Sequence, residues 1–165
     1  MWTFLARFLG TIGLIVVGSM PLSAQPTADE LTLRPGDTIT WTVSPPHQLR
    51  FGGSVTHNGA PLPLTPFATV QTLLDLNPAL TAGADGIALG PTGVGTKVTA
   101  TVKSSATAGS EFFFTCGFGP HNNLMVTIPF KIAAASGPPR QIEIMSAMPP
   151  RWVLKTATGD KNLNR

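Results

Sequence analysis

Cysteine is nearly absent from this chain, since Cys116 is the only one among 165 residues. A single cysteine excludes an internal disulfide, and in an exported protein a lone thiol is vulnerable to oxidation and to intermolecular pairing. A thiolate that binds a metal ion is deprotonated and engaged by that ion, which gives such a cysteine a chemical reason to exist. An inert buried thiol is the alternative interpretation.

Charge is also scarce, with 11 Lys and Arg against 8 Asp and Glu. So few charges give nucleic-acid binding little support. We find no internal repeat in the sequence, and no nucleophile triad, carboxylate pair or phosphate loop stands out. The usual sequence signs of an enzyme are therefore missing.

The apolar run from Phe8 to Val17 is interrupted by glycine and ends before Pro21, short of a comfortable bilayer span. Arg7 precedes it and small residues follow it up to Ala24, a pattern typical of a secretory signal. A retained membrane anchor is the alternative. We predict a signal peptide over residues 1–24, cleavage after it, and an exported periplasmic or extracellular protein without a membrane span.

Proline and glycine are abundant, with 16 and 17 residues, and they separate short runs rich in Val, Thr, Ile and Phe. This pattern favours many brief strands over long helices and predicts an all-β sandwich or barrel. In the predicted strand 111–116, Phe112, Phe114 and Cys116 fall on one inward face. Strands are predicted over residues 31–43 with a turn at 35–37, and over 49–55, 96–102, 111–116 and 124–132, while 73–80 is a weak helical candidate.

The composition changes at Ala133. Residues 25–132 hold five basic and six acidic residues, whereas 133–165 hold five basic and two acidic ones. We predict a core domain over 25–132 and a basic C-terminal extension over 133–165 that steers acidic partners. The competing view is that residues 141–145 pair with a sheet edge and that Trp152 packs on the core.

A thiol, an imidazole and a thioether occur within ten residues, at Cys116, His121 and Met125, on a loop that leaves a buried strand. These soft and borderline ligands suit copper. His47 can supply a second imidazole, because it follows the strand that ends near Val43 and adjacent strands of a sandwich can bring their ends to one pole. The predicted metal ligands are therefore His47, Cys116, His121 and Met125.

Other candidate ligands are weaker. His57 lies in a polar turn and is interpreted as a surface loop residue. Met145 and Met148 have thioethers that could bind Cu(I), but methionines in such a segment more often pack against other residues.

The segments 33–41, 47–51 and 112–116, together with the spacing Cys-x4-His-x3-Met, resemble the plastocyanin and azurin family. The resemblance implies a Greek-key β-sandwich of the cupredoxin type with one type 1 copper ion. It also implies that His121 is the port for electrons, within an apolar surface patch. Gln48 stands where the family commonly has asparagine. The candidate patch residues are Pro46, Phe118, Pro120 and Leu124.

The function implied is the shuttling of single electrons between redox proteins by transient docking of a monomer, with acidic partners expected. Four protein ligands leave no open position for a substrate, so an enzyme is not expected. One alternative is a copper carrier or storage protein, supported by Met145 and Met148. The other is a metal-free interaction module, supported by Gln48 and the unmatched tail.

Overall fold

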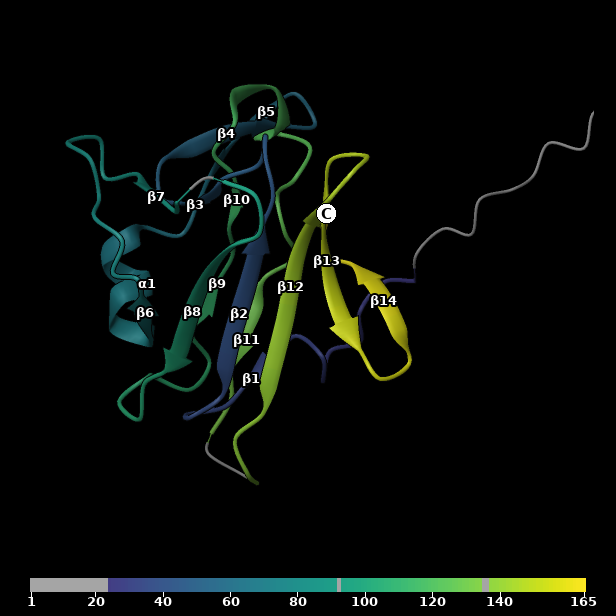
Figure 1. The fold of residues 1–165 in the computed structure, drawn as a ribbon. Helices are drawn as coiled ribbons and strands as arrows, with labels where there is room; N and C mark the ends of the chain where they lie inside the picture. Colours follow the sequence, from purple (N-terminus) through teal and green to yellow (C-terminus); the bar gives the residue numbers. More distant parts are fainter. Residues whose placement is uncertain (1–23, 92, 135–136) are drawn as a thin grey trace, which may run out of the picture.

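A computed structural model of the chain describes residues 24–91, 93–134 and 137–165. The predicted signal peptide lies outside these residues, except for Ala24. The described chain is mostly β-structure with one short helix, α1 (Phe67–Leu73), and a 3-10 turn, η1 (Gly119–His121) (Figure 1). No helix in the described ranges is long and apolar enough to cross a membrane.

The largest sheet has six strands in the order β14-β13-β12-β2-β8-β6. Its central strand β2 pairs in parallel with β12 on one side and antiparallel with β8 on the other (Figure 1). The strands of this sheet are β2 (Thr38–Val43), β6 (Leu74–Asn77), β8 (Thr96–Val102), β12 (Gln141–Ala147), β13 (Arg151–Thr156) and β14 (Gly159–Asn162).

The other strands form three smaller sheets, ordered β1-β11-β9, β10-β3-β7 and β4-β5. Their strands are β1 (Thr32–Leu33), β3 (Leu49–Phe51), β4 (Ser54–His57), β5 (Ala60–Pro63), β7 (Ala88–Leu89), β9 (Glu111–Phe112), β10 (Thr115–Cys116) and β11 (Phe130–Ile132). This arrangement confirms an all-β protein built from several sheets.

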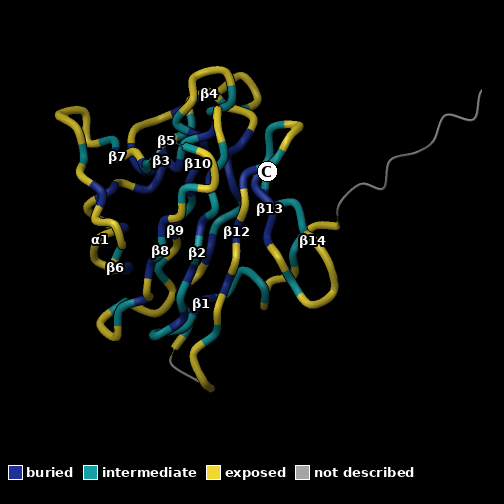
Figure 2. Tube along the Cα trace, in the orientation of Figure 1, coloured by how far each residue is buried: buried dark blue, intermediate teal, exposed yellow. Residues whose placement is uncertain are grey.

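Aromatic side chains form the centre of the core. Trp41 of β2 makes edge-to-face contacts with Phe51 and Phe114, at ring-centroid distances of 6.1 and 5.6 Å. Phe114 also contacts Trp152 of β13 at 5.3 Å. These rings therefore join the large sheet to the smaller ones. Buried residues occur in the large sheet and in the smaller sheets (Figure 2).

Several predicted strands are confirmed, β8 over its full predicted length and the others over part of it. Residues 96–102 form β8, whose alternate residues Val98, Ala100 and Val102 are buried as expected. The predicted strand 111–116 is split into β9 and β10, although its inward alternation holds because Phe112, Phe114 and Cys116 are all fully buried. Of residues 124–132, only β11 is a strand.

The helix predicted at residues 73–80 is wrong. The helix α1 ends at Leu73, and the next residues form β6, which pairs with β8. The physical reason is the period-two alternation of apolar and polar residues in Leu74–Asn77, which suits an edge strand with one buried side.

The segment predicted to be a C-terminal extension is part of the large sheet. β12 lies between β2 and β13, and Ile144, Trp152 and Leu163 are fully buried. The competing view, in which residues 141–145 pair with a strand and Trp152 packs on the core, therefore describes the observed arrangement. A boundary after Ile132 would cut through a single packed unit.

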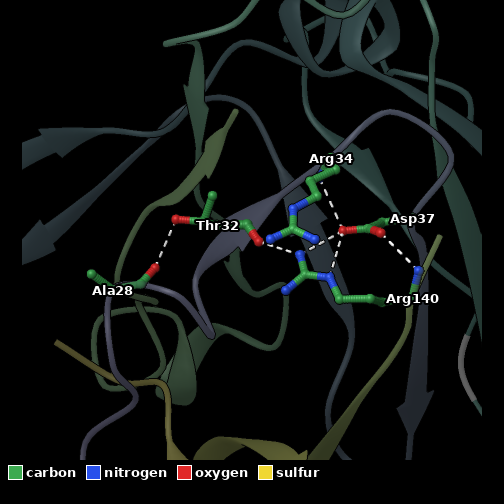
Figure 3. Close-up of polar contacts among 5 residues, drawn as sticks. All are labelled: Ala28, Thr32, Arg34, Asp37 and Arg140. Carbon is green, nitrogen blue, oxygen red and sulfur yellow. Dashed lines mark hydrogen bonds and ion pairs between the residues drawn. The ribbon is translucent and has the colours of Figure 1, made fainter. Parts of the chain in front are cut away.

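A buried ion pair fastens this segment to the beginning of the sheet. The Asp37 carboxylate is fully buried and accepts hydrogen bonds from the Arg34 backbone N–H at 2.9 Å and the Arg140 backbone N–H at 2.8 Å. The Arg140 guanidinium donates to the same carboxylate at 3.1 and 2.6 Å, and it also donates to the Thr32 carbonyl (Figure 3). This group of contacts around Asp37, the Asp37 clasp, holds the start of β12 beside the start of β2.

Candidate metal centre

His47 is held in a short turn beyond the end of β2. Its backbone N–H donates to the Ser44 carbonyl at 2.9 Å, and the Ser44 N–H donates to the Ser146 hydroxyl of β12 at 2.8 Å. The segment 44–47 includes two consecutive prolines, which restrict its backbone. The His47 side chain is almost fully buried.

Cys116 approaches His47 because β10 pairs antiparallel with β3. Cys116 lies opposite Leu49 in this register, and one residue further on the Gly117 N–H donates to the Gln48 carbonyl at 2.8 Å. The backbone thus joins the two candidate ligand segments at Gln48. The Cys116 side chain is fully buried.

His121 and Met125 follow on the loop after β10. The turn η1 ends at His121, whose ring is half-buried and lies edge-to-face against Phe118 at 5.0 Å. The Met125 backbone N–H donates to the His121 carbonyl at 3.0 Å, and the Met125 side chain is fully buried. The two candidate ligands on this loop are therefore ordered by local turns.

The structure brings His47, Cys116 and His121 together into one buried cluster that could hold a metal ion. Their ligand atoms all lie within 4.8 Å of one another. The two imidazole Nδ1 atoms are 3.2 Å apart, and His47 Nδ1 is 3.8 Å from Cys116 Sγ. Ligand bonds of about 2.0–2.3 Å at angles of about 105–120° separate donor atoms by about 3.2–3.8 Å, so these two spacings are compatible with a common ion.

Two backbone N–H groups point toward the Cys116 sulfur. The Gln48 backbone N–H points to it at 3.3 Å and the Phe118 backbone N–H at 3.4 Å. Burial raises the pKa of the Cys116 thiol, while these two donors act in the opposite direction. The metal-free site therefore holds a neutral thiol, and a metal ion has to displace its proton.

The second buried candidate ligand, His47, is also uncharged near neutral pH. Burial lowers the pKa of His47, the nearby His121 lowers it further, and the backbone of Ala147 acts in the opposite direction. The Nε2 atom of His47 is buried without a hydrogen bond of good geometry. A neutral imidazole has a free lone pair for a metal ion, so the site needs no deprotonation at this position near neutral pH.

The remaining candidate ligands lie apart from the cluster. His57 belongs to β4, and its Nδ1 atom is 3.1 Å from the Asn123 carbonyl oxygen. Met145 lies on the exposed face of β12, and Met148 is exposed in the turn before β13. Neither methionine is buried as Met125 is.

Sequence reasoning gave no role to residues 52–95, yet this region reaches the site. A Cβ atom on Gly117 would lie 2.6 Å from the Leu89 side chain and 2.8 Å from Gln48 Oε1, so a larger residue after the cysteine would displace these two side-chain ends. Leu89 pairs with Arg50 and thus comes over the ligand loop from β7. No local pattern marks this contact, because the partners are separated by 28 residues and meet only in the sheet.

Comparison of the chain with protein-family models, with curated proteins and with solved structures found no match.

Proposed function

We propose that the protein is an exported, monomeric electron carrier with one type 1 copper ion and a Greek-key fold of the cupredoxin type. The observation that carries this proposal is the buried cluster of His47, Cys116 and His121, with Met125 buried in the same hydrophobic core as Cys116. One thiolate, two imidazoles and a thioether are the donor set of blue copper sites. When bound, the copper ion supplies a one-electron couple.

The surrounding residues hold the ligands in nearly fixed positions. Cys116 is fixed by strand pairing, and its sulfur accepts two backbone N–H groups. The turn that carries His47 is tied to β12, since the Ser44 N–H donates to the Ser146 hydroxyl. A ligand set that moves little on a change of charge keeps the reorganisation energy of electron transfer small, which favours shuttling over chemistry on a substrate.

The exposed end of the cluster suits a docking surface. His121 is the half-buried candidate ligand, and large exposed apolar side chains lie on two segments, the ligand loop and the turn between β12 and β13: Phe118 at 38%, Leu124 at 53% and Met148 at 63%. The ligand loop, residues 117–127, carries no charged residue. We propose that redox partners dock here weakly and transiently.

The proposal is tested by adding Cu(II) to the purified chain and recording visible and electron paramagnetic resonance spectra. We expect one copper per chain and an intense thiolate-to-copper charge-transfer band, both absent in Cys116→Ser. His121→Asn should lose the band as well, whereas His57→Asn, the matched change at the third histidine, should keep it.

The alternatives give different results. A carrier or storage protein would release copper quickly and would not cycle reversibly between Cu(I) and Cu(II) in voltammetry. A metal-free interaction module would show no band with Cu(II). A blue Cys116→Ser variant would mean that the ligand assignment is wrong.

A further inference from the structure

Three consecutive backbone carbonyls of the ligand loop, at Asn122, Asn123 and Leu124, each accept a hydrogen bond from a side chain outside the loop. The Thr115 hydroxyl donates to the Asn122 carbonyl at 2.5 Å. His57 Nδ1 lies 3.1 Å from the Asn123 carbonyl, which can only accept, so Nδ1 carries the proton. The third carbonyl is held by Asn164.

Asn164 uses its whole side chain in this part of the structure. Its Nδ2 group donates to the Leu124 carbonyl at 2.8 Å and to the Pro150 carbonyl at 3.2 Å, while its Oδ1 atom accepts the Trp152 backbone N–H at 2.9 Å. Asn164 also forms a β-bridge with Thr127. One side chain therefore joins the ligand loop to the turn before β13.

The three donors come from three separate elements. Thr115 belongs to β10, His57 to β4, and Asn164 follows β14, 40 residues from Leu124. On the ligand loop, they hold the stretch between two of the candidate ligands, His121 and Met125, and tie it to elements outside the loop. Removing one hydrogen bond of average strength from a loop carbonyl should increase the equilibrium constant for local opening of the loop about tenfold.

We propose that Thr115, His57 and Asn164 form a loop brace that positions Met125 relative to His121 and Cys116. This inference rests on the proposed function for its redox consequence, because Met125 would be the weak thioether ligand of that site. The brace residues are positioning residues that touch neither the metal nor a substrate. Loss of a donor would let the weak axial thioether withdraw, which disfavours Cu(II) more than Cu(I) and raises the reduction potential.

The test uses Asn164→Leu and His57→Leu, which remove a donor from elements that carry no ligand. In copper-loaded protein, each variant should shift the reduction potential upward, toward that of Met125→Leu, and broaden the electron paramagnetic resonance lines. In metal-free protein, amide hydrogen exchange at Leu124 and Met125 should accelerate by about tenfold.

Two control variants separate positioning from general stability. His57→Asn retains a side-chain N–H donor and should restore the potential and the exchange rates. Thr156→Val removes the hydroxyl bond to the Gly159 carbonyl at the far end of the β13–β14 hairpin, and it should lower stability without moving either measurement.

The outcomes decide the proposal even if one variant does not fold, since His57→Leu tests the brace independently of Asn164. Wild-type potential and wild-type exchange in the folded variants would overturn it. If the wild-type protein binds no copper, the proposed function fails, while faster exchange at Leu124 and Met125 in the metal-free variants still supports the brace and unchanged exchange overturns it.

Discussion

Replacing Asp37 with asparagine tests the clasp between β2 and β12. The carboxylate is fully buried and accepts four hydrogen bonds, from Arg34 and Arg140 (Figure 3). Removing one partner of a buried ion pair costs about 3–5 kcal/mol, and Arg140, which is 34% exposed, recovers part of this from water. We expect Asp37→Asn to lower the free energy of unfolding by about 2–4 kcal/mol at pH 6.

The loss should depend on pH in a defined direction. Burial alone would raise the pKa of Asp37, but the hydrogen bonds from Arg140 and Arg34 outweigh it and hold the pKa below its ordinary value. A lowered folded-state pKa gives stability that is present above the unfolded value of about 3.9 and is lost as the pH falls through the folded value. The difference between wild type and Asp37→Asn should therefore shrink below about pH 4.

Urea unfolding of the metal-free protein at pH 6 and at pH 3 measures this difference. Asp75→Asn is the matched control, because Asp75 is 70% exposed in its pair with Lys103 and should cost less than about 0.5 kcal/mol. The reasoning is refuted if Asp37→Asn costs no more than Asp75→Asn, or if its cost is the same at both pH values.

Three further predictions concern the site and the C-terminal segment. Met125→Leu should raise the reduction potential and keep the blue colour, while the exposed control Met145→Leu should leave the potential unchanged in voltammetry; complete loss of copper would contradict an axial role. Copper uptake above pH 7.5 should release about one proton per ion, because burial raises the pKa of the Cys116 thiol, and calorimetry in buffers of different ionisation enthalpy measures this release. Truncation after Ile132 removes six buried apolar side chains worth about 1.5–3 kcal/mol each. Their total of about 9–18 kcal/mol is as large as the usual domain stability of about 5–15 kcal/mol, so circular dichroism should show no cooperative unfolding. A truncated chain that folds and binds copper would contradict that last expectation.

The C-terminal segment, residues 133–165, was predicted to be an extension but forms three strands of the large sheet. Its basic composition and the prolines before it suggested an appendage, whereas the alternation of Ile142 and Ile144 indicated a strand. Alternation reports which residues are buried, but backbone hydrogen bonds are nearly independent of side-chain type, so the pattern does not name the partner strand. The parallel pairing of β12 with β2 follows from tertiary packing and the Asp37 clasp.

The sequence by itself determined the local features of this protein. The two-residue period of a strand placed Phe112, Phe114 and Cys116 on one buried face, and the spacing from Cys116 to Met125 put three candidate ligands within one ten-residue segment. Both features depend only on residues close along the chain. Only the tertiary structure decided that His47 meets Cys116 across 69 residues and that Asn164 reaches Leu124 across 40. Contacts between distant segments depend on strand order and register, which single residues leave open and which the packing of the whole core fixes.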